Sequence, residues 1–295
     1  MTEVRISSHR SVLQPCILEG YTFQLDPYIG CRHNCHYCYA LNEAETDWTR
    51  EIQIHQDIRS QLSDEIASID TQPIYIGWNS DAYQPLEADY RQTRQALELL
   101  AERGFPVSVL TKSDLVVRDI DLFKRMPDSS AGISIAFQND NDRELFEADT
   151  PPNRERLEAL KKLHEEGIRT YTLICPVIPF ITDVRELISL AEPYSDEIWV
   201  YALNLNGYED RNWQNIRQIL QEHYPEMVKE FRDVIRNELR RNPDGLTWAQ
   251  LKERLDLPYK SPCSTWVYRM EQEIGLKRTK GNGRAFVWRL GQNNS

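Results

Sequence analysis

The sequence PYIGCRHNCHYCYA, residues 27–40, places three of the chain's six cysteines within eight residues. Cys31, Cys35 and Cys38 can converge from one short loop on a single metal centre. Thiolate sulfur is a soft ligand that selects iron-sulfur clusters, zinc or copper(I). A structural zinc site is closed by four ligands, whereas an iron-sulfur cube held by three cysteines leaves one iron open to another molecule. The number three therefore favours a cluster with an open iron.

The length and composition indicate a globular protein with one large domain. A chain of 295 residues accommodates an α/β domain of about 200–250 residues together with a smaller module. Apolar residues make up 40% and charged residues 27%, which is typical of a folded chain. We find no apolar run of about 18 residues and no signal peptide, so we expect a cytoplasmic protein without a membrane span. In that reducing compartment, clustered cysteines serve as metal ligands more often than as disulfide partners.

The net charge of −11 is unevenly distributed along the chain. Residues 229–295 contain 14 Lys and Arg against 8 Asp and Glu, a balance of +6. Residues 1–228 contain 21 against 38, a balance of −17. An acidic body repels phosphate backbones, whereas a basic module attracts them or docks on the acidic body. We therefore expect the two regions to have different partners.

Short apolar strands alternate with helices between residues 60 and 205. The predicted strands are 73–77, 107–110, 131–137, 170–175 and 198–203. The predicted helices are 60–69, 90–102, 120–124, 154–166 and 183–191, after a helix that begins near Tyr37. Short connections between them indicate βαβ units and a parallel sheet. The pattern predicts an α/β fold, a partial (β/α)6-type barrel over residues 1–222, with its site at the carboxyl ends of the strands.

The region 223–295 follows another pattern. Three helices are predicted at 224–241, 246–255 and 262–274, followed by strands at 276–279 and 285–290. The residues KGNGR between the two strands suit a hairpin turn. Three helices and then a basic hairpin is the element order of a winged helix, so we predict a winged-helix-like domain here.

The cysteine loop resembles the Cys-x3-Cys-x-aromatic-Cys signature of the radical S-adenosylmethionine (radical SAM) enzymes, with Tyr37 in the aromatic position. The resemblance implies a [4Fe-4S] cluster on Cys31, Cys35 and Cys38, whose open iron binds the amino and carboxylate groups of S-adenosylmethionine. It also implies a reductant such as a flavodoxin or ferredoxin, because reduction of the cluster would cleave S-adenosylmethionine to a 5′-deoxyadenosyl radical. The alternative is a zinc site completed by His33, His36, Cys175 or Cys263.

Within the superfamily, residues 20–205 are similar to the spore photoproduct lyase-like group. The motifs that carry this similarity are PYIGC at 27–31, SDAYQPLE at 80–87, TKS at 111–113 and PVIP at 176–179. Two positions depart from the group: Ala82 stands where proline is usual, and FEA at 146–148 stands where Glu-Pro is usual. Both departures concern the group and leave the cysteine signature intact.

The predicted strand ends supply polar side chains that suit S-adenosylmethionine. Lys112 could meet the carboxylate of the cofactor as a point charge, and Arg154 could meet it as a planar fork. Three residues after the strand 73–77 are placed to accept from the ammonium, and Ser134 could reach the ribose. With the aromatic residue of the signature, the predicted cofactor-binding set is Tyr37, Asn79, Ser80, Asp81, Lys112, Ser134 and Arg154.

The sequence leaves the substrate open. Trp78 and Tyr83 suit either stacking on a substrate or packing, and Cys175 suits either a hydrogen-atom donor or a small buried apolar side chain. The basic C-terminal module suits nucleic acid, whereas its many aromatic residues also suit protein docking. We predict a radical SAM enzyme acting on an unidentified substrate, with a nucleic-acid base as the candidate. The alternative is an iron-sulfur redox-sensing winged-helix transcription regulator without catalysis.

Overall fold

The computed structural model of the chain describes residues 3–7, 11–126, 128–178, 181–203, 210–224, 235–255, 262, 264–280 and 285–291. The chain divides into two compact units, Met1–Tyr201 and Ala202–Ser295. The domain limits expected from the sequence, 1–222 and 223–295, stay a prediction. No helix in the described ranges is long and apolar enough to cross a membrane.

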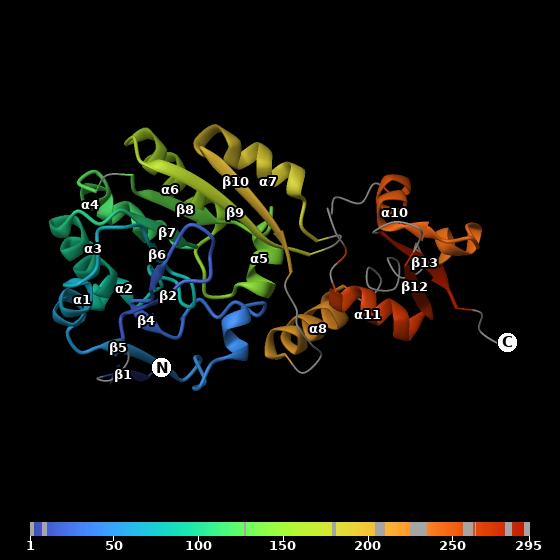
Figure 1. Cartoon of the computed structure of the whole chain (residues 1–295), viewed down its shortest axis with the longest axis horizontal. Helices are drawn as coiled ribbons and strands as arrows, with labels where there is room; N and C mark the ends of the chain where they lie inside the picture. The colour runs from blue at the N-terminus through green and yellow to red at the C-terminus, as the bar shows by residue number, and fades with distance from the viewer. Residues whose placement is uncertain are drawn as a thin grey trace. The chain divides into compact units, whose positions relative to one another are not determined.

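The first unit is built on a seven-stranded sheet with the order β10-β9-β8-β7-β6-β3-β2 (Figure 1). The strands are β2 (Leu13–Pro15), β3 (Phe23–Leu25), β6 (Ile74–Ile76), β7 (Val107–Thr111), β8 (Ser130–Ser134), β9 (Arg169–Val177) and β10 (Glu197–Ala202). The neighbours from β3 to β9 are parallel, and β2 pairs antiparallel with β3. The predicted α/β fold with a parallel sheet is confirmed.

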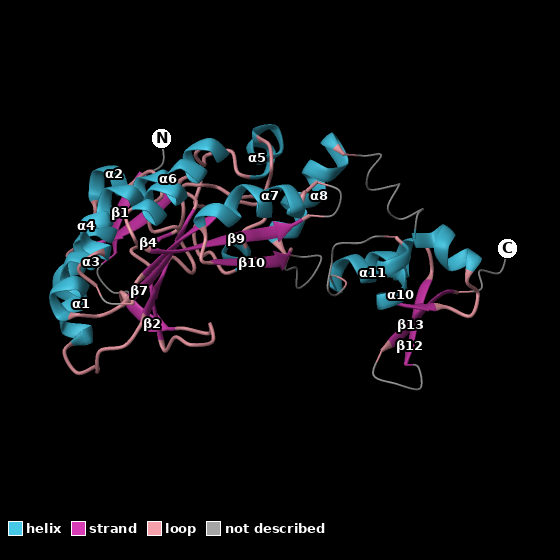
Figure 2. Cartoon of the chain, turned by 90° about the horizontal axis from the view of Figure 1, so that it is seen from above, coloured by secondary structure: helices cyan, strands magenta, loops and turns pink. Residues whose placement is uncertain are grey.

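Helices connect these strands, and α6 and α7 lie against β8 and β9 (Figures 1 and 2). They are α1 (Ile58–Ile66), α2 (Glu87–Tyr90), α3 (Gln92–Arg103), α4 (Ile120–Phe123), α5 (Asp140–Phe146), α6 (Asn153–Glu165) and α7 (Val184–Ala191). The strands and helices predicted between residues 60 and 203 are present, with ends that differ by at most three residues. The helix expected from Tyr37 is reduced to one 3-10 turn, η1 (Tyr39–Asn42).

A small second sheet supports the cysteine loop. It has the order β1-β5-β4, formed by β1 (Glu3–Ser7), β5 (Glu51–His55) and β4 (Tyr28–Ile29). Tyr28 and two isoleucines of β5 form its own buried cluster. Gly30, where β4 leads into the cysteines, has φ +96°, and a Cβ there would lie 2.8 Å from Ile52 Cδ1. The entry to the cysteine loop is therefore packed closely against β5 and requires glycine.

The second unit has a separate hydrophobic core. Its elements are α8 (Arg211–His223), a helix at 235–241, β11 (Leu246–Thr247), α10 (Trp248–Arg254), α11 (Ser264–Glu273), β12 (Leu276–Lys280) and β13 (Phe286–Leu290). The three strands form an antiparallel sheet with the order β11-β13-β12. The buried core comprises Ile235, Leu239, Leu246, Leu251, Val267, Met270, Ile274, Leu276 and Trp288. The winged-helix assignment stays a prediction, and residues 225–234 of the helix expected at 224–241 lie outside the described residues.

Gly77 and Gly104 offer a matched test of packing after β6. Both have positive φ, but a Cβ on Gly77 would lie 2.7 Å from the Leu110 carbonyl oxygen, whereas a Cβ on Gly104 would have nothing within 4 Å. We predict that Gly104→Ala lowers the free energy of unfolding by about 1–2 kcal/mol, the penalty of the left-handed conformation. Gly77→Ala should lower it by roughly 1–3 kcal/mol more, because the backbone of the neighbouring strand must shift. Urea denaturation measures both losses, and equal losses would contradict the close approach.

Candidate active site

Hydrogen bonds from two other segments hold the cysteine loop. The buried side chain of Gln84 donates to the Gly30 carbonyl at 2.9 Å and accepts from the Arg32 amide at 2.8 Å. The His36 amide donates to the carbonyl of Phe146, at the end of α5, at 2.9 Å. The loop has little regular secondary structure of its own, so these contacts fix its path.

The three thiols of the loop lie in one protected neighbourhood. Cys35 is buried, and Cys31 and Cys38 are half-buried. Burial raises the pKa of all three thiols, and it raises the pKa of Cys31 to about 12. Negative charge on the other two thiols raises the pKa of Cys35 further, while the ammonium of Lys112 lowers it. The cation favours the thiolate form that binds metal.

The three thiols of the loop are the ligand set that an iron-sulfur cluster with one open iron requires. Within the described ranges, no three His, Cys, Asp or Glu side chains are grouped as ligands of one metal ion. In a cube-shaped iron-sulfur cluster each cysteine binds a different iron, so the three cysteine sulfurs do not share one metal ion. His33, considered above as a fourth zinc ligand, has Nδ1 3.1 Å from the Asp149 carbonyl oxygen and Nε2 3.3 Å from Asp81 Oδ2. The second contact has ion-pair distance without hydrogen-bond alignment.

Asn79, Ser80 and Asp81 follow β6 as predicted, and hydrogen bonds fasten all three. The buried carboxylate of Asp26 accepts from the Asn79 amide and side chain, both at 2.9 Å, and from the Ser80 amide at 3.2 Å. The Ser80 hydroxyl donates to the Tyr28 carbonyl at 2.7 Å. Much of the polar capacity of this segment therefore positions the segment itself beside the cysteine loop.

Asp81 links the segment after β6 to the end of β7. Its carboxylate accepts from the Thr111 hydroxyl at 2.6 Å, the Lys112 amide at 2.7 Å and the Tyr83 amide at 2.8 Å. Burial opposes ionisation, but His33, Thr111 and the Lys112 amide keep the pKa of Asp81 below its ordinary value. Asp81 thus stays charged and joins two strand ends across the site.

Lys112 brings a cation to the centre of the site. Its Nζ lies 5.6 Å from the centre of the Tyr37 ring, within the range of a cation–π contact. Burial would lower the pKa of this amine, but the negative charges of Cys35, Glu147 and Asp81 raise it above its ordinary value. Among the described residues, no carboxylate forms a hydrogen bond or an ion pair with this ammonium. Lys112 follows β7 and lies next to the ring of Tyr37, and its role in binding the cofactor carboxylate stays a prediction.

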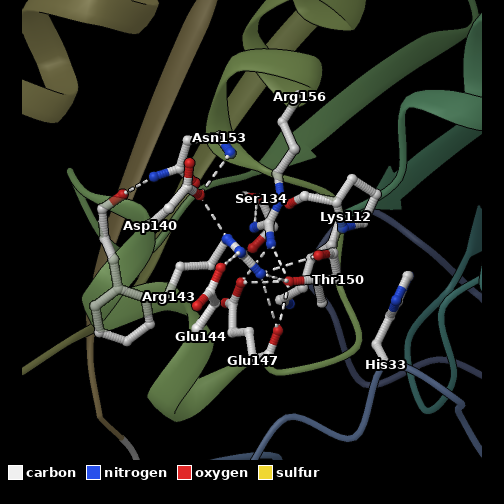
Figure 3. Close-up of polar contacts among 12 residues, drawn as sticks. His33, Lys112, Ser134, Asp140, Arg143, Glu144, Glu147, Thr150, Asn153 and Arg156 are labelled. Atoms are coloured by element: carbon white, nitrogen blue, oxygen red, sulfur yellow. Dashed lines mark hydrogen bonds and ion pairs between the residues drawn. The ribbon is translucent and has the colours of Figure 1, made fainter.

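Glu147 and Arg156 form a buried ion pair next to the site (Figure 3). Glu147 and Arg156 are both fully buried and lie 2.6 Å apart, and the Tyr37 hydroxyl donates to Glu147. Arg156 also donates to the Ser134 carbonyl at 3.0 Å and to the Pro151 carbonyl at 2.9 Å. Burial would raise the pKa of Glu147, but Arg156 and Lys112 lower it below its ordinary value.

The structure does not bring Arg154 to this site. The side chain of Arg154 is 81% exposed and lies 3.7 Å from Glu158, whereas Arg156, two residues along α6, is buried. Helical periodicity could have identified Arg156 as a buried residue, because it lies one turn before the buried Leu160, on the same face of the helix. Neither Glu147 nor Arg156 was among the residues expected from the sequence.

Ser134 ends β8 with a buried hydroxyl. Its exposed fraction is 1%, and in the described structure its Oγ has no hydrogen-bond partner. A buried hydroxyl without a partner is unfavourable, so this atom suits a polar group of a ligand. The role of Ser134 in ribose binding, expected from the sequence, stays a prediction.

Three further residues left open by the sequence can now be placed. Tyr83 is fully buried and lies under Arg118, so it packs. Trp78 lies between the rings of Tyr39 and Tyr75, at centroid distances of 5.8 and 5.9 Å. Burial raises the pKa of Cys175 to about 11, and the charges of Lys112, Glu147 and Cys38 also act on its thiol. Cys175 therefore lies in the electrostatic neighbourhood of Lys112 and Cys38.

Arg154 and Arg156 provide a matched pair for testing the buried ion pair. Arg156→Met leaves the Glu147 carboxylate buried without its partner, which should lower the free energy of unfolding by about 3–5 kcal/mol. Arg154→Met removes an exposed side chain of the same helix and should change it by less than about 0.5 kcal/mol. Chemical denaturation of the two variants measures the difference. Similar losses at both positions would contradict the placement of Arg156.

Comparisons with known proteins identify a family and several relatives of this chain. The sequence pattern of the radical SAM superfamily matches residues 25–192. An uncharacterised protein of Methanocaldococcus jannaschii is 32% identical over 218 residues, which cover 72% of this chain and 81% of the relative. A protein named radical SAM Nalpha-GlyT isomerase, of Pseudomonas phage M6, is 26% identical over 230 residues, 75% of this chain and 47% of that protein.

The fold has a counterpart among solved structures. A spore photoproduct lyase structure superposes with a TM-score of 0.59 at 14% identity, covering 97% of this chain and 74% of that chain. At this identity the similarity concerns the fold alone. The match over residues 25–192 and the archaeal relative show the family directly. The chain therefore belongs to the radical SAM superfamily, whose enzymes use a [4Fe-4S] cluster and S-adenosylmethionine.

Proposed function

We propose that Cys31, Cys35 and Cys38 hold the [4Fe-4S] cluster of this radical SAM enzyme and that the adjoining strand ends bind S-adenosylmethionine. The observation that carries the proposal is the fixed, half-buried thiol loop beside Lys112, a cation with no carboxylate partner among the described residues. When bound, the cluster and S-adenosylmethionine supply a 5′-deoxyadenosyl radical by reductive cleavage. The chain's residues bind and orient these groups and exclude water.

Each residue of the pocket receives a separate task. Lys112 pairs with the carboxylate of the cofactor as a point charge, and the Ser134 hydroxyl, buried without a partner, bonds the ribose. Asn79 and Asp81 flank the ammonium of the cofactor from the segment after β6. Tyr37, held by Glu147, keeps its ring under the Lys112 ammonium. Arg156 acts through Glu147 and so is a positioning residue.

The reaction needs an electron donor and a substrate from outside the chain. We propose a flavodoxin or ferredoxin as the reductant, because the superfamily's chemistry starts with one-electron reduction. For the substrate we propose a nucleic-acid base, supported by the basic balance of residues 229–295. A redox-sensing regulator without catalysis would not need a lysine, a free hydroxyl and a carboxylate network around an open iron. The pocket therefore supports the enzyme over the regulator.

Anaerobic reconstitution tests the cluster assignment. With iron, sulfide, dithionite and S-adenosylmethionine, the protein should produce 5′-deoxyadenosine, which chromatography detects. Cys35→Ala should lose both the cluster absorbance and the product, because one of three ligands is missing. Cys16→Ala, which removes a half-buried cysteine outside the loop, should retain both. An active Cys35→Ala variant would overturn the assignment, and an intact cluster without product would favour the regulator.

A second experiment tests the role of Lys112. Lys112→Met should weaken S-adenosylmethionine binding by roughly 1.5–3 kcal/mol, about 10- to 150-fold, because a charge-assisted hydrogen bond is lost. Equilibrium dialysis with the reconstituted protein measures the affinity, and the cluster absorbance confirms equal loading. Lys124→Met removes an exposed lysine that pairs with Glu166 and should leave the affinity unchanged. An unchanged affinity in Lys112→Met would refute the proposed pairing.

A further inference from the structure

The hairpin of the second unit presents a basic outer face. In the antiparallel ladder of β12 and β13, Lys277 stands directly opposite Arg289, and Thr279 stands opposite Val287. Lys277, Thr279 and Arg289 are exposed. Lys280 is also exposed, at the end of the described strand, but strand alternation puts it on the opposite face of the ladder, with Arg278. Positive side chains therefore gather on a short ribbon that is two strands wide.

The opposition of Lys277 and Arg289 is unfavourable in the free protein. Like charges directly across a ladder destabilise it, because their side chains lie close together. Within the described residues of this unit, the ion pairs join Glu238 to Arg241 and Arg254, and Glu271 to Arg278. None of them reaches Lys277, Lys280 or Arg289. Among the described residues, the acceptor of Arg289 is a neutral one, the Asp244 carbonyl, at 2.8 Å.

The hairpin that carries these charges is packed against the core of the unit. Its inner face carries Trp288, which is 2% exposed and packs in the core of the unit beside Trp248. A Cβ on Gly245 would lie 2.5 Å from Arg289 Cγ, so the turn before β11 lies directly against the arginine stem. The charges are thus fixed on a packed ribbon, and their repulsion is retained in the folded unit.

We propose that this hairpin docks duplex DNA through the phosphate backbone, with Lys277 and Arg289 on its outer face and Lys280 at its edge. Phosphate oxygens supply the anions that Lys277, Lys280 and Arg289 lack within the described protein. Duplex DNA carries one negative charge per 1.7 Å of helix axis, so one ribbon meets several charges at once. The B-form major groove, about 12 Å wide, admits a two-stranded ribbon, whereas the major groove of A-form RNA is too narrow.

The order of elements in the unit supports the same partner. A helix at 235–241, then β11, α10, α11, β12 and β13 is the order of a winged helix, with the hairpin as its wing. The inference is independent of the radical chemistry, since the hairpin and the cysteine loop belong to different units. It extends the proposed function by naming duplex DNA as the macromolecule that the second unit brings to the enzyme.

Fluorescence anisotropy of the full chain with a labelled DNA duplex of about 20 base pairs, two helical turns, tests the proposal. The affinity is measured between about 50 and 200 mM salt. The double variant Lys277→Gln with Lys280→Gln removes two phosphate contacts, so the slope of log K against log salt should become shallower by about 1.8. The control, Arg50→Gln with Arg103→Gln, makes the same change in net charge on the exposed surface of the first unit.

Thermal unfolding separates docking from folding. Replacement of Lys277 removes the repulsion with Arg289 and no described hydrogen bond, so the variant should melt at the same temperature or higher while binding DNA more weakly. Equal losses of affinity in the two double variants would overturn the proposal, since total charge would then explain binding. Absence of DNA binding at low salt would overturn it in favour of an acidic protein partner. Tighter binding to duplex RNA of the same sequence would overturn the choice of DNA.

Discussion

The buried ion pair between Glu147 and Arg156 is the interaction on which the geometry of the site depends. It joins the segment after α5 to the first turn of α6, and through the Tyr37 hydroxyl it reaches the cysteine loop. Two buried charges are tolerated only when each is satisfied by the other and by further hydrogen bonds. Arg156 meets that condition through carbonyl oxygens at Ser134 and Pro151. A loop without regular secondary structure thereby acquires a rigid support.

The charges around the thiols alternate in sign. Asp81 bridges two strand ends, and Lys112 lies over the ring of Tyr37. Glu147 accepts from the Tyr37 hydroxyl and pairs with Arg156. In a region shielded from water such charges interact strongly, so each fixes the protonation state of its neighbours. The thiols lie next to the one member of this series that has no carboxylate partner among the described residues. An anionic ligand would complete the alternation at that point.

Sequence patterns predicted the central architecture because its signals are local. Apolar strands and helices with a period of 3.6 residues identified β6 to β10 and most of the intervening helices, and the spacing of Cys31, Cys35 and Cys38 identified the metal chemistry. The small sheet of β1, β4 and β5 was not predicted because its pairing joins distant parts of the chain, and local patterns do not show such pairing. Arg154 was expected to meet the cofactor carboxylate as a planar fork, but the helical phase puts Arg156, and not Arg154, on the inward face of α6. Glu147 lies between helices, in a stretch without periodicity that gives no such signal.

The separate core of the second unit also has a consequence for the evolution of the chain. Met270 and Trp288 belong to a hydrophobic cluster that shares no member with the sheet around the cysteine loop. Damage to that cluster would loosen the C-terminal unit and leave the thiol loop with its own supports, Gln84 and the Phe146 carbonyl. The two halves of the chain are thus free to diverge at different rates. Recombination could replace the basic module while the radical chemistry is kept, so that the same reaction would be directed to a different binding partner.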